Sequence, residues 1–170
     1  EWIKKFSSKQ LLATNGKPFE LSTMFQLHTL VSKNLDDQHN PAGQLRNNRP
    51  TQKTIVGKDA HGGTYRPPKC IEDIEYLIQA WLEWLNSPNI INQPAMIRAC
   101  LAHYYFELIH PFWDGNGRTG RLIEMFIFEQ SGYRFTSSAI WKYYQTNIHE
   151  YFALFNLCRK RADKKEENPN

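Results

Sequence analysis

The chain has 170 residues and a formal net charge of +4, with 41% hydrophobic and 14% aromatic residues. This length and apolar content suffice for one well-packed domain and exclude an intrinsically disordered chain. Charged residues interrupt the apolar runs every few positions, so we expect no membrane-spanning helix. The three cysteines are far apart, which excludes a disulfide framework or a paired-cysteine metal site.

Charge and the N-terminal sequence indicate the compartment and the class of partner. The first ten residues lack the apolar segment and the cleavage site of a secretory signal, and the cysteine usage fits a reducing compartment. We therefore expect a cytoplasmic protein, or one delivered into a host cell by a route other than Sec. The isoelectric point of about 9.0 reflects a basic run over 159–165, which two glutamates follow directly. Because such a run is typical of a solvated helix end, nucleic acid is not the expected partner.

The N-terminal part is predicted to form one helix and one hairpin. Apolar residues recur at helical spacing over 19–35, before a turn-rich stretch at 36–43. Residues 44–68 are rich in Asn, Arg, Gly and Pro and contain one short β-type run, 53–56. This run and the glycines after it predict a small hairpin from Lys53 to Tyr65.

The rest of the chain shows helical periodicity, interrupted by turns that contain proline or glycine. The predicted helices are residues 71–85, closed by Ser87-Pro88, then 92–94 to 110, 118–130, 138–147 and 148–161. Pro111 ends the second of these, because proline cannot continue a helical ladder. The expected fold class is mostly α, a helical bundle with one small β-hairpin. We expect a single domain over 1–170, with its core at about 21–157 and a charged tail at 159–170.

The loop between the second and third of these helices contains residue types that turn formation alone does not explain. It reads His110-Pro-Phe-Trp-Asp-Gly-Asn-Gly-Arg-Thr-Gly-Arg121. Gly115 and Gly117 allow positive φ and a close approach of the backbone to a ligand. The first amides of the next helix are unpaired and lie at the positive end of its dipole, so a phosphate chain can bind there. Asn116 can add a side-chain donor.

The charged residues of the loop complete a set suited to a nucleotide. Arg118 and Arg121 are three positions apart, so their guanidinium groups can hold two phosphates. Asp114 is a carboxylate of the kind that binds Mg²⁺ together with phosphate oxygens and water. His110 is suited to act as general base toward a hydroxyl. Each residue alone has a structural explanation, as a helix cap, a turn or a solvated helix face, but their combination favours a functional site.

The loop resembles the signature of Fic domains (filamentation induced by cAMP), in which Trp113 occupies a variable position. The resemblance covers roughly Leu21 to Leu157. Three further segments are similar to the family's flap region: Gly43-x-x-Arg46, Ile55-Val56-Gly57 and Tyr65-x-Pro67-Pro68. Tyr151-Phe152-x-Leu154 is similar to a later helix of the family that has aromatic residues near the nucleotide.

The resemblance implies a protein adenylyltransferase, which transfers AMP from Mg-ATP to a Ser, Thr or Tyr hydroxyl of a target protein and releases pyrophosphate. It implies that His110 is the catalytic base and that Asp114 holds Mg²⁺. The implied nucleotide-binding residues are Gly115, Asn116, Gly117, Arg118, Thr119, Gly120, Arg121, Tyr151 and Phe152. The implied flap, which docks an extended target segment as an added strand, comprises Thr54, Ile55, Val56 and Gly57, with Ile55 against the target residue.

The sequence leaves alternatives open. A kinase-like branch of the fold replaces the second glycine of the loop with Lys, whereas this chain has Gly117, and other branches use UTP, GTP or CDP-choline. From a different class, the chain could be a non-catalytic basic binding module. The family's inhibitory string, Ser or Thr followed four residues later by Glu and then Gly or Asn, does not occur; Asp163-x-x-x-Glu167-Asn168 has only its last two residues. A separate, antitoxin-like inhibitory protein is therefore a candidate partner besides the target.

Overall fold

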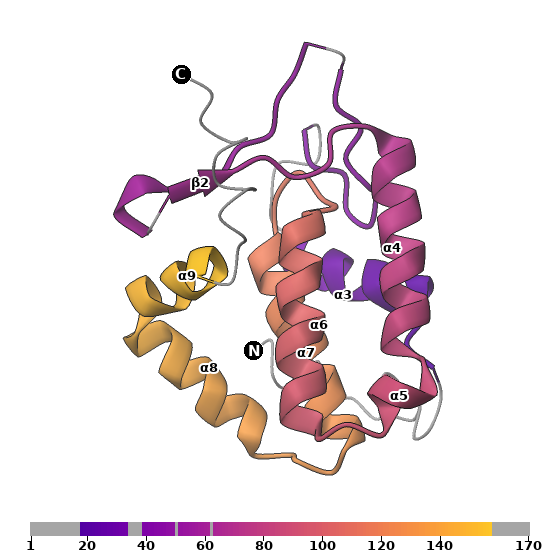
Figure 1. Cartoon of the computed structure of the whole chain (residues 1–170), viewed down its shortest axis with the longest axis vertical. Helices are drawn as coiled ribbons and strands as arrows, with labels where there is room; N and C mark the ends of the chain where they lie inside the picture. Colours follow the sequence, from indigo (N-terminus) through magenta and orange to yellow (C-terminus); the bar gives the residue numbers. More distant parts are fainter. Residues whose placement is uncertain (1–17, 34–38, 50, 62, 158–170) are drawn as a thin grey trace.

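The computed structural model describes residues 18–33, 39–49, 51–61 and 63–157. These residues form a mostly helical protein with a small two-stranded antiparallel sheet, which confirms the predicted fold class (Figure 1). The helices are α3 (Leu21–Ser32), α4 (Ile71–Leu85), α5 (Pro88–Ile91), α6 (Ala95–Ile109), α7 (Asn116–Gln130), α8 (Thr136–Thr146) and α9 (Ile148–Leu157). The strands are β1 (Val56–Lys58) and β2 (Gly63–Tyr65), joined by the 3-10 turn η1 (Asp59–His61).

Helices α6 and α7 form the centre of the fold. Helix α7 contacts α3, α6 and α8, and α4 packs on α6 (Figure 1). An unbroken run from Leu122 to Phe128 on α7 is buried, as expected for a helix surrounded by other elements. The two central helices come close where Gly120 faces His103, because a Cβ at position 120 would lie 2.4 Å from the His103 ring. Glycine is therefore required there for helix packing.

The outer helices bury apolar stripes against this centre. Helices α4 and α3 each contribute apolar residues at helical spacing. The buried members are Met24, Leu27, Val31, Ile74, Ile78, Trp81, Leu82 and Leu85. The side chain of Asn86, the residue that caps α4, makes two hydrogen bonds to the backbone of Phe19. It accepts from the Phe19 N–H at 2.8 Å and donates to the Phe19 carbonyl at 2.9 Å. This pair holds the start of α3 against the end of α4.

Several predicted boundaries differ from the observed ones. Pro88 begins the short helix α5 rather than only closing α4, because proline is also favoured in a first helical turn. Helix α7 begins two residues earlier than predicted, since Gly115 takes a left-handed conformation as its N-cap. Helix α8 begins at Thr136 instead of residue 138. The final helix is described to Leu157, so residues 158–161 and the predicted charged tail lie outside the described residues.

The hairpin is present where it was predicted, but its first strand is shifted. Val56 pairs with Tyr65 and Lys58 with Gly63, so β1 follows the β-type run at 53–56 rather than coinciding with it. Thr54 instead accepts a hydrogen bond from the Asn48 side chain at 2.9 Å, within the loop that leads to the hairpin. In Figure 1 the hairpin lies beside α9, and η1 contacts that helix.

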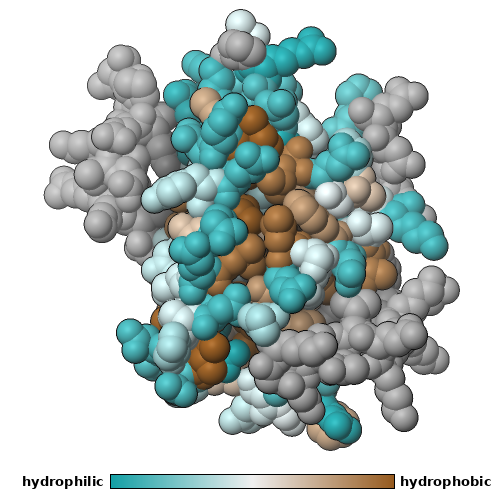
Figure 2. Space-filling model, turned by 90° about the vertical axis from the view of Figure 1, so that its right-hand side faces the viewer, coloured by the Kyte–Doolittle hydropathy of each residue, from teal (hydrophilic) through white to brown (hydrophobic). Residues whose placement is uncertain are grey.

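One face of the molecule is partly apolar. Figure 2 shows hydrophobic residues exposed between hydrophilic ones on the side of the molecule where α4 lies. A groove of about 370 Å³ between α4 and α6 is lined by Leu77, Ala80, Trp81, Trp84, Tyr105, Leu108 and Ile109. Within the described part of the chain, every helix is too short or too polar to cross a membrane.

Candidate active site

His110 occupies a strained backbone position at the end of α6. It has φ 50° and ψ 59°, and it is the one non-glycine residue with positive φ among those that the structure describes. Its N–H donates to the Phe106 carbonyl at 2.9 Å, and Pro111 then directs the chain out of the helix. A left-handed histidine costs about 1–3 kcal/mol and persists only where surrounding contacts hold it.

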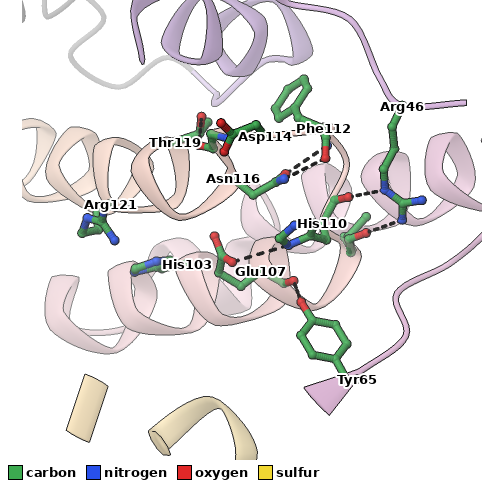
Figure 3. Close-up of polar contacts among 12 residues, drawn as sticks. Arg46, Tyr65, His103, Glu107, His110, Phe112, Asp114, Asn116, Thr119 and Arg121 are labelled. Carbon is green, nitrogen blue, oxygen red and sulfur yellow. Dashed lines mark hydrogen bonds and ion pairs between the residues drawn. The ribbon is translucent and has the colours of Figure 1, made fainter. Parts of the chain in front are cut away.

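Arg46 supplies those contacts. Its side chain is fully buried, and its Nε donates to the His110 carbonyl at 2.6 Å (Figure 3). The other guanidinium nitrogens donate to the Ile109 and Pro68 carbonyls and to the Asn48 side chain. The guanidinium therefore binds carbonyls at the C-terminal end of α6, where a positive charge is favoured by the helix dipole. This bonding fixes the turn from which His110 projects.

Glu107 and Tyr65 flank the imidazole. The buried Nδ1 of His110 lies 3.7 Å from Glu107 Oε2 (Figure 3). The Tyr65 ring meets the imidazole edge to face, with centroids 6.4 Å apart, and its hydroxyl donates to the Glu107 carbonyl. The hairpin that carries Tyr65 is thus attached to the same helical turn as His110.

Asn116 closes the loop rather than facing solvent. Its side-chain oxygen accepts from the Phe112 N–H at 2.9 Å, and its side-chain nitrogen donates to the Phe112 carbonyl at 2.8 Å (Figure 3). Both polar atoms of the side chain are engaged and the residue is buried, and its predicted contact with an anion stays a prediction. The backbone N–H of this residue, at the start of α7, has no partner within the helix and can bind a ligand.

Thr119 and Gly120, which are also predicted to contact nucleotide, are both buried. Thr119 is fully buried, and its hydroxyl donates to the Gly115 carbonyl at 2.9 Å. Gly120 packs against the His103 ring of α6. These contacts help to place α7, and the role of both residues in nucleotide binding stays a prediction.

A buried histidine on α3 holds the other end of the loop. The Gly43 N–H donates to His28 Nδ1 at 2.9 Å, so Nε2 carries the proton and donates to the Asp114 carbonyl at 3.0 Å. The His28 ring also stacks on Phe112, with centroids 3.6 Å apart. Burial lowers the pKa of His28 from 6.5, despite the opposing effect of the Asp114 carbonyl. His28 is therefore a neutral structural group.

This lowered pKa predicts a pH-dependent stability. Below about pH 6.5 the unfolded chain binds a proton at His28 that the folded chain binds only at lower pH, so the free energy of unfolding falls as the pH decreases. His28→Gln keeps a donor and an acceptor but does not titrate. Urea unfolding measured between about pH 7 and 5 should show a smaller pH dependence for His28→Gln than for the wild type. Equal slopes would contradict this role of His28.

Asp114 is exposed at the surface of the loop. One carboxylate oxygen accepts from the Gly115 N–H at 2.5 Å, and the other pairs with Arg118 at 3.2 Å. Clusters of three or more His, Cys, Asp or Glu that could hold a metal ion are absent from the described ranges. A single accessible carboxylate beside a phosphate-suited helix start fits Mg²⁺, which takes one or two carboxylates and completes its shell with phosphate oxygens and water.

The two loop arginines have different neighbours. Arg118 donates to the Val31 carbonyl of α3 at 3.5 Å in addition to its pair with Asp114. Arg121 instead points toward α8 and α9, where it donates to the Tyr151 hydroxyl at 3.3 Å and lies over the Trp141 ring at 5.1 Å. Their guanidinium groups thus leave α7 toward separate elements, although they are three residues apart.

A pocket of about 240 Å³ lies between the hairpin, the loop and α9. It brings together predicted site residues that are distant in sequence, because β1, the start of α7 and α9 converge there. The lining residues are Val56, Gly57, Lys58, Tyr65, Glu107, Gly117, Tyr151, Phe152 and Phe155. His110 contacts two of them, Glu107 and Tyr65. The other two predicted flap residues, Thr54 and Ile55, precede β1, and the Ile55 side chain is 59% exposed.

This arrangement defines a class of protein: a small helical domain in which a histidine-bearing turn leads into a glycine-capped helix beneath a β-hairpin. Residues 18–128 match the model of the Fic/DOC family. The chain therefore belongs to the Fic/DOC family, which confirms the resemblance seen in the sequence.

Known relatives agree with this assignment. The chain is 30% identical over 129 residues to a protein named protein adenylyltransferase fic-1 from Caenorhabditis briggsae, a match that covers 76% of this chain and 23% of that protein. A solved structure of Fic-1 from C. elegans matches with a TM-score of 0.57 and 28% identity, over 76% of this chain and 34% of that one. A Fic family protein from Desulfovibrio desulfuricans shares the fold, with a TM-score of 0.70 at 20% identity over 98% of this chain and 44% of that one. The chain thus spans less than half of each of these proteins.

Proposed function

We propose that the chain is a protein adenylyltransferase that transfers AMP from ATP to a Ser, Thr or Tyr hydroxyl of a target protein. The observation that supports this most directly is the placement of His110, which Arg46 fixes in a left-handed turn directly before a phosphate-suited helix start. The names of the relatives that match the chain support the same reaction.

His110 is the proposed general base. Because its Nδ1 is turned toward Glu107, Nε2 is the nitrogen left for the incoming hydroxyl. His110 takes the hydroxyl proton as the target oxygen attacks the α-phosphorus of ATP. A bond forms between that oxygen and the α-phosphorus, and the bond from the α-phosphorus to the bridging oxygen breaks. Pyrophosphate then leaves with the electron pair of the broken bond.

The start of α7 is the proposed phosphate site. The first bond of its ladder runs from the Thr119 N–H to the Gly115 carbonyl, so the preceding N–H groups of Gly117 and Arg118 can face phosphate oxygens at the positive end of the helix dipole. Arg118 would exchange its partly exposed pair with Asp114 for a phosphate, and Arg121 would bind a second one. Asp114 would hold Mg²⁺, which when bound neutralises phosphate and pyrophosphate charge.

The hairpin and α9 would select the two substrates. Tyr151 and Phe152 line the pocket and offer aromatic surface to the nucleotide. Strand β1 pairs with β2 on one side, and an extended target segment could add to its other edge. The exposed Ile55 side chain at the start of this edge would contact the target residue. A separate inhibitory protein would act by covering this site.

Intact mass spectrometry tests this proposal. We expect a target protein incubated with the chain and Mg-ATP to gain one AMP, and we expect EDTA to prevent the gain. A gain of one phosphate would support a kinase-like transfer instead, and products formed only from UTP, GTP or CDP-choline would identify another donor. Unmodified targets combined with tight, steeply salt-dependent binding of DNA or RNA would support the non-catalytic binding module.

A further inference from the structure

A hydrogen-bonded series of buried polar side chains runs from the interior of the helix pair to Arg121. His103 Nδ1 lies 3.1 Å from Glu124 Oε2, and His103 Nε2 lies 3.1 Å from the Tyr151 hydroxyl. The same hydroxyl lies 3.3 Å from Arg121 Nη1. The three inner residues are each at most 5% exposed. They come from three different helices, α6, α7 and α9, whose relative positions they therefore link.

The hydrogen-bonding capacities of these groups determine which group donates and which accepts at each step of this series. A carboxylate only accepts, so His103 Nδ1–H donates to Glu124, which leaves Nε2 as an acceptor for the Tyr151 O–H. The Tyr144 O–H donates to the second Glu124 oxygen at 2.8 Å. Burial raises the pKa of both Tyr151 and Tyr144, so both phenols keep their protons. A lone pair of the Tyr151 oxygen is then directed to the Arg121 guanidinium.

Arg121, at the end of this hydrogen-bonded series, lies beside the proposed nucleotide site. Tyr151 lines the pocket between the hairpin and α9, as does Gly117. A Cβ placed on Gly117 would be 3.5 Å from Arg121 Nη1, which puts the guanidinium next to the phosphate-suited start of α7. Arg121 and His103 project from facing helices in Figure 3. Buried polar groups destabilise a core unless they are hydrogen-bonded to one another. A connected series of them that ends on the Arg121 guanidinium therefore requires an explanation.

We propose that Glu124, His103 and Tyr151 are positioning residues, which together hold the Arg121 guanidinium in the orientation that binds a phosphate of the nucleotide. The Trp141 and Tyr151 rings restrict the guanidinium from the side, 5.1 and 5.7 Å from its central carbon. The Tyr151 oxygen fixes its rotation by accepting one N–H. The remaining N–H groups are then presented to the ligand before it binds, which reduces the ordering required on binding. This inference rests on the proposed function.

Tyr151→Phe tests the proposal with the smallest change, because it removes only the hydroxyl that joins His103 to Arg121. We expect the Kd and the KM for ATP to rise about tenfold, as for the loss of one hydrogen bond to a charged group, with the KM for the target protein unchanged. A smaller folded fraction would lower kcat and leave both KM values unchanged. The matched control is Tyr143→Phe, the same substitution at an exposed residue of α8, for which we expect wild-type constants.

A double-mutant cycle tests whether Tyr151 acts through Arg121. In an Arg121→Ala background, Tyr151→Phe should change ATP affinity by less than about twofold, because the group it positions is absent. Glu124→Gln should raise the Kd in the same direction as Tyr151→Phe but by less. Independently of activity, the NMR signal of the Arg121 Nε–H group, assigned by its loss in Arg121→Ala, should shift in Tyr151→Phe without nucleotide.

The outcomes separate this inference from the proposed function. If the wild type transfers AMP but Tyr151→Phe behaves like Tyr143→Phe, the positioning role is wrong and the proposed function stands. Equal effects of Tyr151→Phe with and without Arg121 would also overturn it, because the hydroxyl would then act on the nucleotide by another route. If the wild type neither binds ATP nor transfers AMP, both the proposed function and the positioning role are wrong.

Discussion

His110→Ala is expected to lower the rate of AMP transfer by about a thousandfold, within the range for loss of a general base. The affinity for Mg-ATP should change little, because the phosphate-binding groups belong to the start of α7 and not to the imidazole. Single-turnover transfer to a target, followed by intact mass, measures the first quantity, and calorimetric titration with ATP measures the second. Transfer at more than a tenth of the wild-type rate would show that His110 is not the base.

The left-handed backbone at position 110 requires a second variant. Alanine is strained at φ 50°, so part of the effect of His110→Ala could arise from a displaced loop. Asparagine adopts this conformation more readily than other non-glycine residues, and its amide does not act as a base at neutral pH. His110→Asn should therefore lose transfer as fully as His110→Ala while retaining a melting temperature closer to that of the wild type. His149→Ala, on the exposed surface of α9 and outside the pocket lining, serves as the histidine control.

The sequence predicted those parts of the protein that depend on local patterns. The helices follow from apolar periodicity, and the Fic-like loop follows from twelve consecutive residues, so neither requires tertiary information. Short segments were less well placed. Pro88 is compatible with both the end of one helix and the start of another, and the pattern at 53–56 does not show which residues pair. The element types were therefore predicted more accurately than their boundaries.

The residues that hold the loop could not be assigned in this way, because their partners are distant in sequence. Arg46 binds a carbonyl 64 residues away, and His28 binds one 86 residues away. The sequence marks Arg46 only as part of a flap-like string and indicates no role for its side chain. Asn116 is difficult for another reason, because its side-chain amide can bind either an anion or a backbone peptide group. Only the fold shows that it binds the backbone of Phe112. Local sequence thus identifies candidate chemical groups, whereas the groups that orient them are identified only from contacts between distant segments.

Arg46→Met is expected to have the largest effect on stability of the substitutions considered. It retains an apolar stem of similar length but leaves the carbonyls of Ile109 and His110 without their buried donor. Breaking such a buried, charged hydrogen-bond set should lower the free energy of unfolding by about 3 kcal/mol. Arg46→Lys keeps the charge but not the planar fork, so it should recover only part of this loss. Urea unfolding measures the changes, with Arg49→Met, at an exposed arginine three residues along, as the control.

The same substitution should affect transfer beyond its effect on folding. Arg46→Met removes the side-chain bond to the His110 carbonyl, whereas the backbone N–H of residue 46 can still bind the Pro111 carbonyl at 2.8 Å. Loss of the side-chain bond allows the left-handed turn to relax. A displacement of the imidazole by about 1 Å can cost about a hundredfold in rate. Assayed under conditions where the variant remains folded, Arg46→Met should therefore transfer AMP far more slowly than Arg49→Met while binding Mg-ATP with similar affinity. If Arg46→Met is destabilised but transfers at the Arg49→Met rate, the left-handed turn at His110 is maintained without the Arg46 side chain, which then serves only stability.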